Sequence, residues 1–342
     1  MKQNASCIRA VTAAAVLVLA GCGEPDPKPP AQPGAAEPGS AEEKMTVVDW
    51  ARIANPDRIA RSSEGRVIAI DLSQMEVTDR KLGQLKDLKQ LKVLGLNSCD
   101  LKDEQLAFLS DLPQLEQLHL NMVGVGDEAM PHIGKLKNLR TLSLKQALIS
   151  DEALVHLADL NRLESLNLDM TDVNGTGFVH LRELNRLSNL FVRISKVDNR
   201  GAEQLGRLKQ LRHLGLGMTR ITDAGLRWIG KLKDLRELDL TRKAGEDDYP
   251  ITDDGIGHLS GLRKLEKLRL EGTELTDAGM AHLANLTRLK TLSLSFTKIS
   301  NAGLPHLRDL EALEKIDVSQ TAVSRRGRDA LKNSLPNLKE IR

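Results

Sequence analysis

Apolar residues recur at a fixed spacing from Val67 onward. Eleven units, all 24 residues long except one of 30, begin at Val67, Leu91, Leu115, Leu139, Leu163, Leu187, Leu211, Leu235, Leu265, Leu289 and Leu313. Positions 1, 4, 6, 11, 16, 19 and 22 of a unit are almost always apolar. Positions 4 and 6 alternate with polar neighbours, which predicts a short strand with one buried face. Positions 16 and 19 lie three apart and follow a hydroxyl–acid pair such as Thr222 and Asp223, which predicts a helix.

Each unit therefore predicts a strand, a turn, a helix and a connecting segment that leads back to the next strand. One unit cannot bury its own leucines, so the units must stack into an α/β solenoid. The unit "LRHLGLGMTRITDAGLRWIGKLKD" resembles a leucine-rich repeat of the L-x-x-L-x-L type. It is most similar to the subclass with T-D-x-G-L helices, found in ribonuclease-inhibitor-like and F-box leucine-rich-repeat proteins. The resemblance covers residues 67–334 and implies a right-handed horseshoe of about eleven repeats, a scaffold that does not specify function.

Both ends of the array need covers. Residues 45–66 are interpreted as an N-terminal cap, with a helix over 46–54 and a hairpin between 58–61 and 66–72. At the other end the apolar pattern stops, because Arg328 and Ser334 occupy positions 16 and 22. Residues 335–342 are therefore interpreted as a C-terminal cap.

The N-terminal segment predicts export. Lys2 and Arg9 precede an apolar run over 10–20, which is shorter than the roughly 20 apolar residues that span a bilayer and fits a secretory signal. The run ends in Leu-Ala-Gly-Cys, which resembles the lipobox of bacterial lipoproteins. The resemblance implies a signal peptide over 1–21 and a lipid on Cys22 that anchors the protein to a bacterial membrane, in the periplasm or on the cell surface. Ordinary secretion with a chance cysteine is the alternative.

The segment after Cys22 predicts a disordered tether, because residues 22–44 contain six of the 12 prolines. Removing residues 1–21 leaves 47 basic and 47 acidic side chains of the 49 and 47 in the whole chain. This balance excludes a whole-molecule attraction to nucleic acid. Of the three cysteines, Cys99 stands at position 9, where later units have threonine, and is interpreted as a small buried side chain.

Two repeated residue types resemble chemical sites and are interpreted as structural. Histidine fills position 18 in six units, but Phe108, Gln204 and Trp228 fill the same position, and helices about 8–10 Å apart do not bring ligands to one metal ion. The acid at position 13 is interpreted as a helix-capping device. No nucleophile elbow, phosphate loop or zinc-protease motif appears. The sequence therefore predicts no metal, no cofactor and no enzymatic activity.

The polar strand positions 5 and 7 should cover the concave face of the horseshoe. The side chains predicted to contact a partner there are His119, Asn121, Lys145, Asp169, Phe191, Arg193, Arg269 and Glu271. Tyr249 lies in the insertion of the 30-residue unit and is expected on the rim, where loops on a rigid scaffold often bind. An aromatic beside an arginine is typical of interfaces, although a lone surface Phe191 is the alternative. Apolar residues at position 8 either extend this patch or are half-buried packing.

These patterns favour a monomeric, membrane-anchored protein that recognises a protein or an envelope polymer without catalysis. A structural envelope scaffold with no selective partner is the alternative.

Glycine at position 15 begins only at Gly177, and closer contacts between later helices are one explanation.

Overall fold

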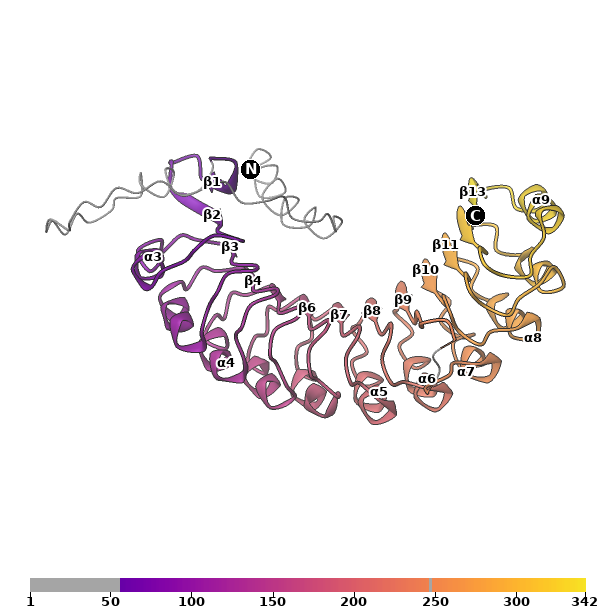
Figure 1. Ribbon diagram of the computed structural model, residues 1–342, viewed down its shortest axis with the longest axis horizontal. Helices are drawn as coiled ribbons and strands as arrows, with labels where there is room; N and C mark the ends of the chain where they lie inside the picture. Colours follow the sequence, from indigo (N-terminus) through magenta and orange to yellow (C-terminus); the bar gives the residue numbers. More distant parts are fainter. Residues whose placement is uncertain (1–55, 246–247) are drawn as a thin grey trace, which may run out of the picture.

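The computed structural model describes residues 56–245 and 248–342, which form an open arc (Figure 1). The predicted signal peptide, the lipid site expected at Cys22, the predicted tether and the helix predicted over 46–54 lie outside the described residues. Strands line the inner side of the arc and helices line the outer side. The predicted leucine-rich-repeat solenoid is confirmed.

The strands form a single sheet in chain order. A short 3-10 turn, η2 (Pro56–Arg58), leads into the first strand. The strands are β1 (Ile59–Arg61), β2 (Val67–Asp71), β3 (Val93–Gly95), β4 (Gln117–His119), β5 (Thr141–Ser143), β6 (Ser165–Asn167), β7 (Asn189–Phe191), β8 (His213–Gly215), β9 (Glu237–Asp239), β10 (Lys267–Arg269), β11 (Thr291–Ser293), β12 (Lys315–Asp317) and β13 (Glu340–Ile341). β1 pairs antiparallel with β2, which confirms the predicted hairpin, and the later neighbours pair in parallel. β13 falls within the segment interpreted as a C-terminal cap and extends the sheet.

The outer layer consists of short helices. They are α3 (Asp79–Leu85), η3 (Asp103–Asp111), η4 (Asp127–Ala129), α4 (Met130–Ile133), η5 (Glu152–Leu157), η6 (Thr176–Leu181), α5 (Asn199–Leu205), α6 (Asp223–Ile229), α7 (Asp253–Gly257), α8 (Asp277–Met280), η7 (Ala281–Leu283), η8 (Leu304–Leu307) and α9 (Arg325–Ser334), where η marks a 3-10 helix. None of the helices in the described part of the chain is both long and apolar enough to cross a membrane.

The leucines of successive units form one continuous core between strands and helices. Leu118, Leu142 and Leu166 at position 4 stand opposite one another in the parallel register and are fully buried. Burying a leucine side chain contributes about 1.5–3 kcal/mol, so the stacked columns supply most of the stability that a single unit lacks. Cys99 belongs to this core, as predicted, and burial raises the pKa of its thiol.

The repeated acid at position 13 has a different partner from the one predicted. It accepts hydrogen bonds from the next unit: Asp223 Oδ1 lies 2.9 Å from the amide nitrogen of Thr252, and Asp253 Oδ1 lies 2.8 Å from that of Thr276. The hydroxyl at position 12 does cap its own helix in some units, as where Thr276 Oγ1 accepts a bond from the amide of Ala278. The acid is therefore a clamp between repeats. Its expected place in the first turn of its own helix is confirmed, as for Asp223 in α6, but its hydrogen-bond partners lie in the next unit.

The glycines at position 15 leave room for this clamp. A Cβ at Gly255 would lie 2.0 Å from Asp223 Oδ1, and one at Gly303 would lie 2.6 Å from Asp277 Oδ1. Successive helices therefore approach each other closely where the glycines occur. The acids Asp103 and Asp127 accept the same kind of bond from units with Ala129 and Ala153 at position 15, so the bond itself does not require glycine.

Candidate binding face

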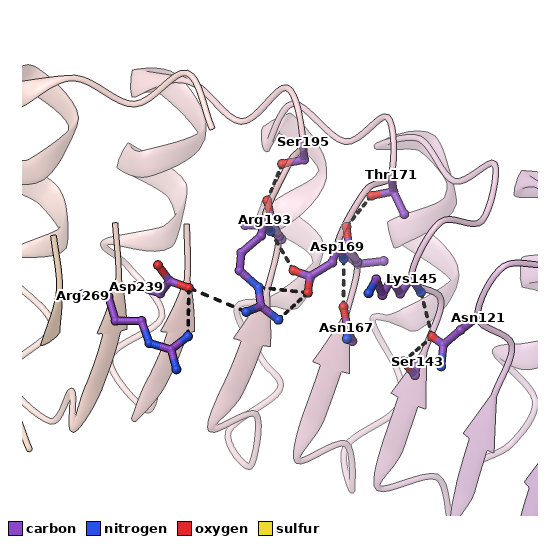
Figure 2. Close-up of polar contacts among 12 residues, drawn as sticks. Asn121, Ser143, Lys145, Asn167, Asp169, Thr171, Arg193, Ser195, Asp239 and Arg269 are labelled. Carbon is purple, nitrogen blue, oxygen red and sulfur yellow. Dashed lines mark hydrogen bonds and ion pairs between the residues drawn. The ribbon is translucent and has the colours of Figure 1, made fainter. Parts of the chain in front are cut away.

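The N-terminal half of the concave face carries a ladder of side-chain amides. Asn97 Oδ1 accepts a 2.9 Å hydrogen bond from the backbone amide of Asn121. In turn, Asn121 Oδ1 accepts one bond from Ser143 Oγ and another, of 3.0 Å, from the backbone amide of Lys145 (Figure 2). The predicted contact Asn121 is therefore half-buried and its oxygen is used to join strands. Lys145 at position 7 supplies a cationic group to this part of the face.

His119 lies in a second environment on β4. The register aligns Asp71, Gly95 and His119 across three neighbouring strands, and a Cβ at Gly95 would lie 2.5 Å from Asp71 Oδ1. Nε2 of His119 is buried and has no hydrogen-bond partner among the described residues. Burial lowers the pKa of His119 and the charge of Asp71 opposes this effect, so the imidazole is neutral at pH 7.

A cavity of about 230 Å³ opens further along the same face, above β8. Its floor is Gly215, which stands in register between Phe191 on β7 and Asp239 on β9. A Cβ at Gly215 would lie 3.0 Å from Phe191 Cδ1, so the absence of a side chain leaves the hollow open. The lining comprises Phe191, Arg193, His213, Leu214, Gly215, Glu237, Leu238, Asp239, Lys267 and Arg269.

Arg193 is held in one orientation at the wall of this cavity. Its Nε and one terminal nitrogen donate to Asp169 Oδ2 at 3.0 and 2.7 Å, and its amide donates to Asp169 Oδ1 at 2.7 Å. Burial by itself would lower the pKa of Arg193, but the bonds to Asp169 and the charges of Asp169 and Asp239 raise it, so the group stays charged. The guanidinium carbon lies 5.7 Å from the centre of the Phe191 ring.

Asp239 lies between two arginines. Its Oδ1 accepts bonds from the amide and hydroxyl of Thr241, and its Oδ2 lies 3.6 Å from Arg193 and 3.8 Å from Arg269 (Figure 2). Both separations exceed hydrogen-bonding distance. The side chains of Asp169 and Asp239 are 4% and 15% exposed, against 38% and 55% for Arg193 and Arg269. Asp169 and Asp239 therefore lie beneath the two arginines. The lining also holds the pair formed by Lys267 and Glu237, whose side chains are 53% and 40% exposed.

The predicted contacts thus fall into separate groups. Phe191, Arg193 and Arg269 meet at the cavity, whereas Asp169 lies below it and supports Arg193. Glu271 follows β10, and its carboxylate accepts a bond from Ser293 Oγ. Tyr249 is half-exposed in the insertion and is not among the described residues that line the cavity.

The apolar residues at position 8 are partly buried and partly open to solvent. They are 38–55% exposed, and they are Met122, Met170, Ile194, Met218 and Phe296. Each has a positive φ, 54° at Ile194 for example, as do the polar residues Gln74, Ser98, Gln146 and Gln320 and also Gly272. A non-glycine residue in this left-handed conformation costs about 1–2 kcal/mol. A β-branched residue there is a genuine outlier.

Among residues 56–245 and 248–342, no group of three or more His, Cys, Asp or Glu side chains could hold a metal ion. The histidines at position 18 lie along the helical layer. Most of them are exposed, as His156 and His282 are.

The groups that converge on the cavity of the concave face are suited to hydrogen bonding and ion pairing with a bound molecule.

A search against protein-family models matches the leucine-rich repeat region over residues 72–249 and 194–342. The chain belongs to the leucine-rich-repeat family. Among solved structures it is similar to an internalin (inlF) from Listeria monocytogenes, with a TM-score of 0.59, 18% identity, and coverage of 82% of this chain and 90% of the internalin. It is also similar to a TDR receptor, with a TM-score of 0.54 and 20% identity over 80% of this chain and 46% of the receptor. A search of curated proteins found no match.

Proposed function

We propose that this leucine-rich-repeat protein binds another protein on its concave face, without catalysis. The observation that carries the proposal is the cavity at Gly215, where an aromatic ring and two arginines converge on an inner surface. Aromatic and arginine side chains dominate the binding energy of protein interfaces. Their counterions lie beneath them, so the arginines are pre-oriented before a partner arrives, which reduces the entropy lost on binding.

A pull-down from envelope extracts tests this function. The full chain is compared with Arg269→Glu on the concave face and with the matched control Arg308→Glu beside η8. A stoichiometric protein that is lost with Arg269→Glu and retained with Arg308→Glu supports recognition. Broad retention that neither variant changes favours the structural scaffold, and capture of an envelope polymer in place of a protein refutes the proposed partner class.

We propose in addition that the protein is exported and anchored through a lipid on Cys22. The support is the apolar run that ends in a lipobox-like sequence. A tether of 22 residues after the cysteine reaches roughly 70 Å when fully extended, enough to hold the arc clear of the membrane surface. The test is the intact mass of the protein from membranes. An acylated N-terminus at Cys22 that Cys22→Ser abolishes supports the proposal, and a chain that retains residues 1–21 without a lipid refutes it.

A further inference from the structure

The backbone of position 8 is dictated by the sheet. The amides of Met170, Ile194 and Met218 donate to the carbonyl oxygens of Arg193, Gly217 and Thr241, each in the next unit, at 2.7–2.9 Å. Reaching that carbonyl turns the chain into the left-handed region, with φ of 54–59° at these three residues. Gly272 occupies the same position of its unit without a side-chain penalty. The fold therefore favours glycine at position 8.

Folding gives no reason for a large apolar residue at this position. Met170, Ile194 and Met218 are 38%, 50% and 46% exposed, so they gain only part of the free energy that full burial would give. The strained backbone is common to units with a polar residue at this position, such as Gln146 and Gln320, so the large apolar side chains are what distinguish these three units. Together they form a partly exposed apolar surface, and we call Met170, Ile194 and Met218 the apolar strip.

The apolar strip follows the cavity-lining strands directly along the chain. Ile194 directly follows Arg193, and Met218 follows Gly217 just beyond the cavity floor at Gly215. The strip crosses three neighbouring units, so at about 4.8 Å per strand it is roughly 10 Å long. Three residues of an extended peptide span about the same length at 3.3 Å each. The size of the strip thus matches a short extended segment lying across the strands.

The charges beside the strip indicate what that segment carries. Arg193 and Arg269 are presented to solvent, while their acidic partners Asp169 and Asp239 lie below them. The exposed acid of the cavity lining, Glu237, is paired with Lys267 at 2.7 Å. The terminal nitrogens that face Asp239 are 3.6 and 3.8 Å from it, which leaves their hydrogen-bonding capacity unused by that carboxylate. A planar carboxylate is the natural acceptor for two guanidinium groups. A cavity of about 230 Å³ admits a single side chain of this kind.

We propose that the apolar strip and the Arg193–Arg269 pair together bind an extended peptide in which an aspartate, a glutamate or the C-terminal carboxylate stands next to apolar side chains. The carboxylate enters the cavity beside Phe191, and the neighbouring apolar side chains lie on Ile194 and Met218. This inference rests on the proposed function, because it names the segment of the protein partner that the concave face receives.

The test is selection of a random heptapeptide library, including members with a free C-terminus, on the full-length chain purified in detergent. The expected result is enrichment of peptides in which a carboxylate adjoins one or more apolar residues. Enrichment of apolar peptides without a carboxylate, or no enrichment at all, overturns the proposal. If the library fails while the pull-down still captures a protein that needs Arg269, only this inference falls. If both fail, the proposed function falls as well.

Matched variants identify the surface that binds a selected peptide. Arg269→Gln and Ile194→Gly should each weaken its affinity by about tenfold or more, as expected for interface anchors. Arg308→Gln and Gln320→Gly are the controls and should leave the affinity unchanged. Gln320 has the same left-handed backbone, with φ of 55°, but lies outside the strip. Both glycine variants should raise the thermal midpoint, because each relieves the same backbone strain, so weaker binding by Ile194→Gly alone cannot be attributed to misfolding.

Two further outcomes overturn the proposal. One is a selected peptide that binds Ile194→Gly or Arg269→Gln as tightly as the unaltered chain. The other is binding of the detergent-free chain to vesicles of phosphatidylglycerol and phosphatidylcholine that is lost with Ile194→Gly, because the strip would then contact a lipid surface.

Discussion

Replacing Gly255 by alanine should break the clamp between two repeats. Gly255 lies in α7, and an added Cβ would be 2.0 Å from Oδ1 and 2.8 Å from Cγ of Asp223 in the preceding unit. That carboxylate accepts bonds from the amide of Thr252 at 2.9 Å and from its hydroxyl at 2.6 Å. The methyl group and the carboxylate cannot occupy the same space, so the carboxylate must move and both bonds are lost.

The expected cost follows from those two bonds. A hydrogen bond to a charged group contributes about 1.5–3 kcal/mol, so two of them set a loss of about 3–6 kcal/mol. The better helix propensity of alanine offsets about 1 kcal/mol of this loss of stability, and hydration of the displaced carboxylate offsets more of it. We therefore expect Gly255→Ala to lower the free energy of unfolding by about 2–3 kcal/mol. Gly83→Ala in α3 is the matched control, because no described heavy atom lies within 4 Å of its Cβ. It should stabilise the protein by about 0.5–1 kcal/mol.

Urea unfolding followed by circular dichroism measures both effects and their cause. The set comprises the unaltered chain, Gly83→Ala, Gly255→Ala, Asp223→Ala and the double variant. In the Asp223→Ala background the obstructing carboxylate is absent, so Gly255→Ala should cost less than about 0.5 kcal/mol. An equal cost of Gly255→Ala in both backgrounds, or a stabilisation like that of Gly83→Ala, would refute the clamp.

Three other predictions concern buried groups. Burial raises the pKa of Cys99, so its thiol should react slowly in the folded chain. In the Cys7→Ser/Cys22→Ser chain, iodoacetamide at pH 8 should modify Cys99 rapidly only after urea unfolding. Rapid alkylation of the folded chain contradicts the place of Cys99 in the core. Burial lowers the pKa of His119, so the unfolded chain binds a proton more readily than the folded chain below the ordinary value of 6.5. The stability contributed by neutral His119 should be full above that pH and fall as the pH drops through it. His119→Gln should flatten this loss between pH 7.5 and 5 in urea titrations. Asp169→Asn should destabilise the chain by about 1.5–3 kcal/mol in the same assay, whereas Asp172→Asn, whose pair with Lys196 is exposed, should cost less than about 1 kcal/mol.

The regular parts of the fold follow from the sequence because each apolar position has one role in every unit. Leu118 and Leu142 are one repeat apart in the chain and stand opposite each other in the sheet. The clamp could not be predicted from a single unit, because Asp223 bonds to Thr252 in the next repeat while its own helix is the only partner visible locally. The left-handed backbone of Ile194 was also hidden, because isoleucine rarely adopts it.

The candidate site was predicted only in part. Phe191, Arg193 and Arg269 stood out as large or charged groups at inward positions, and the structure brings them together. The cavity itself was missed because it arises from an absence of side chains at Gly215. One signal was available: Gly215 and Gly217 fill both inward positions of the same unit, between larger residues on either side. Asp239, which lies between the two arginines, gave no sign of its role until the register of the sheet was known.

Photo-cross-linking in living cells tests the central claim most directly. A photoreactive amino acid replaces Lys145 on the concave face, outside the cavity, and His156 on the outer helical layer serves as the control. Mass spectrometry of the captured molecules should identify one protein joined to the Lys145 position and not to the His156 position. Capture of the same set of molecules from both faces, or of none from the concave face, would contradict recognition through the inner surface of the arc.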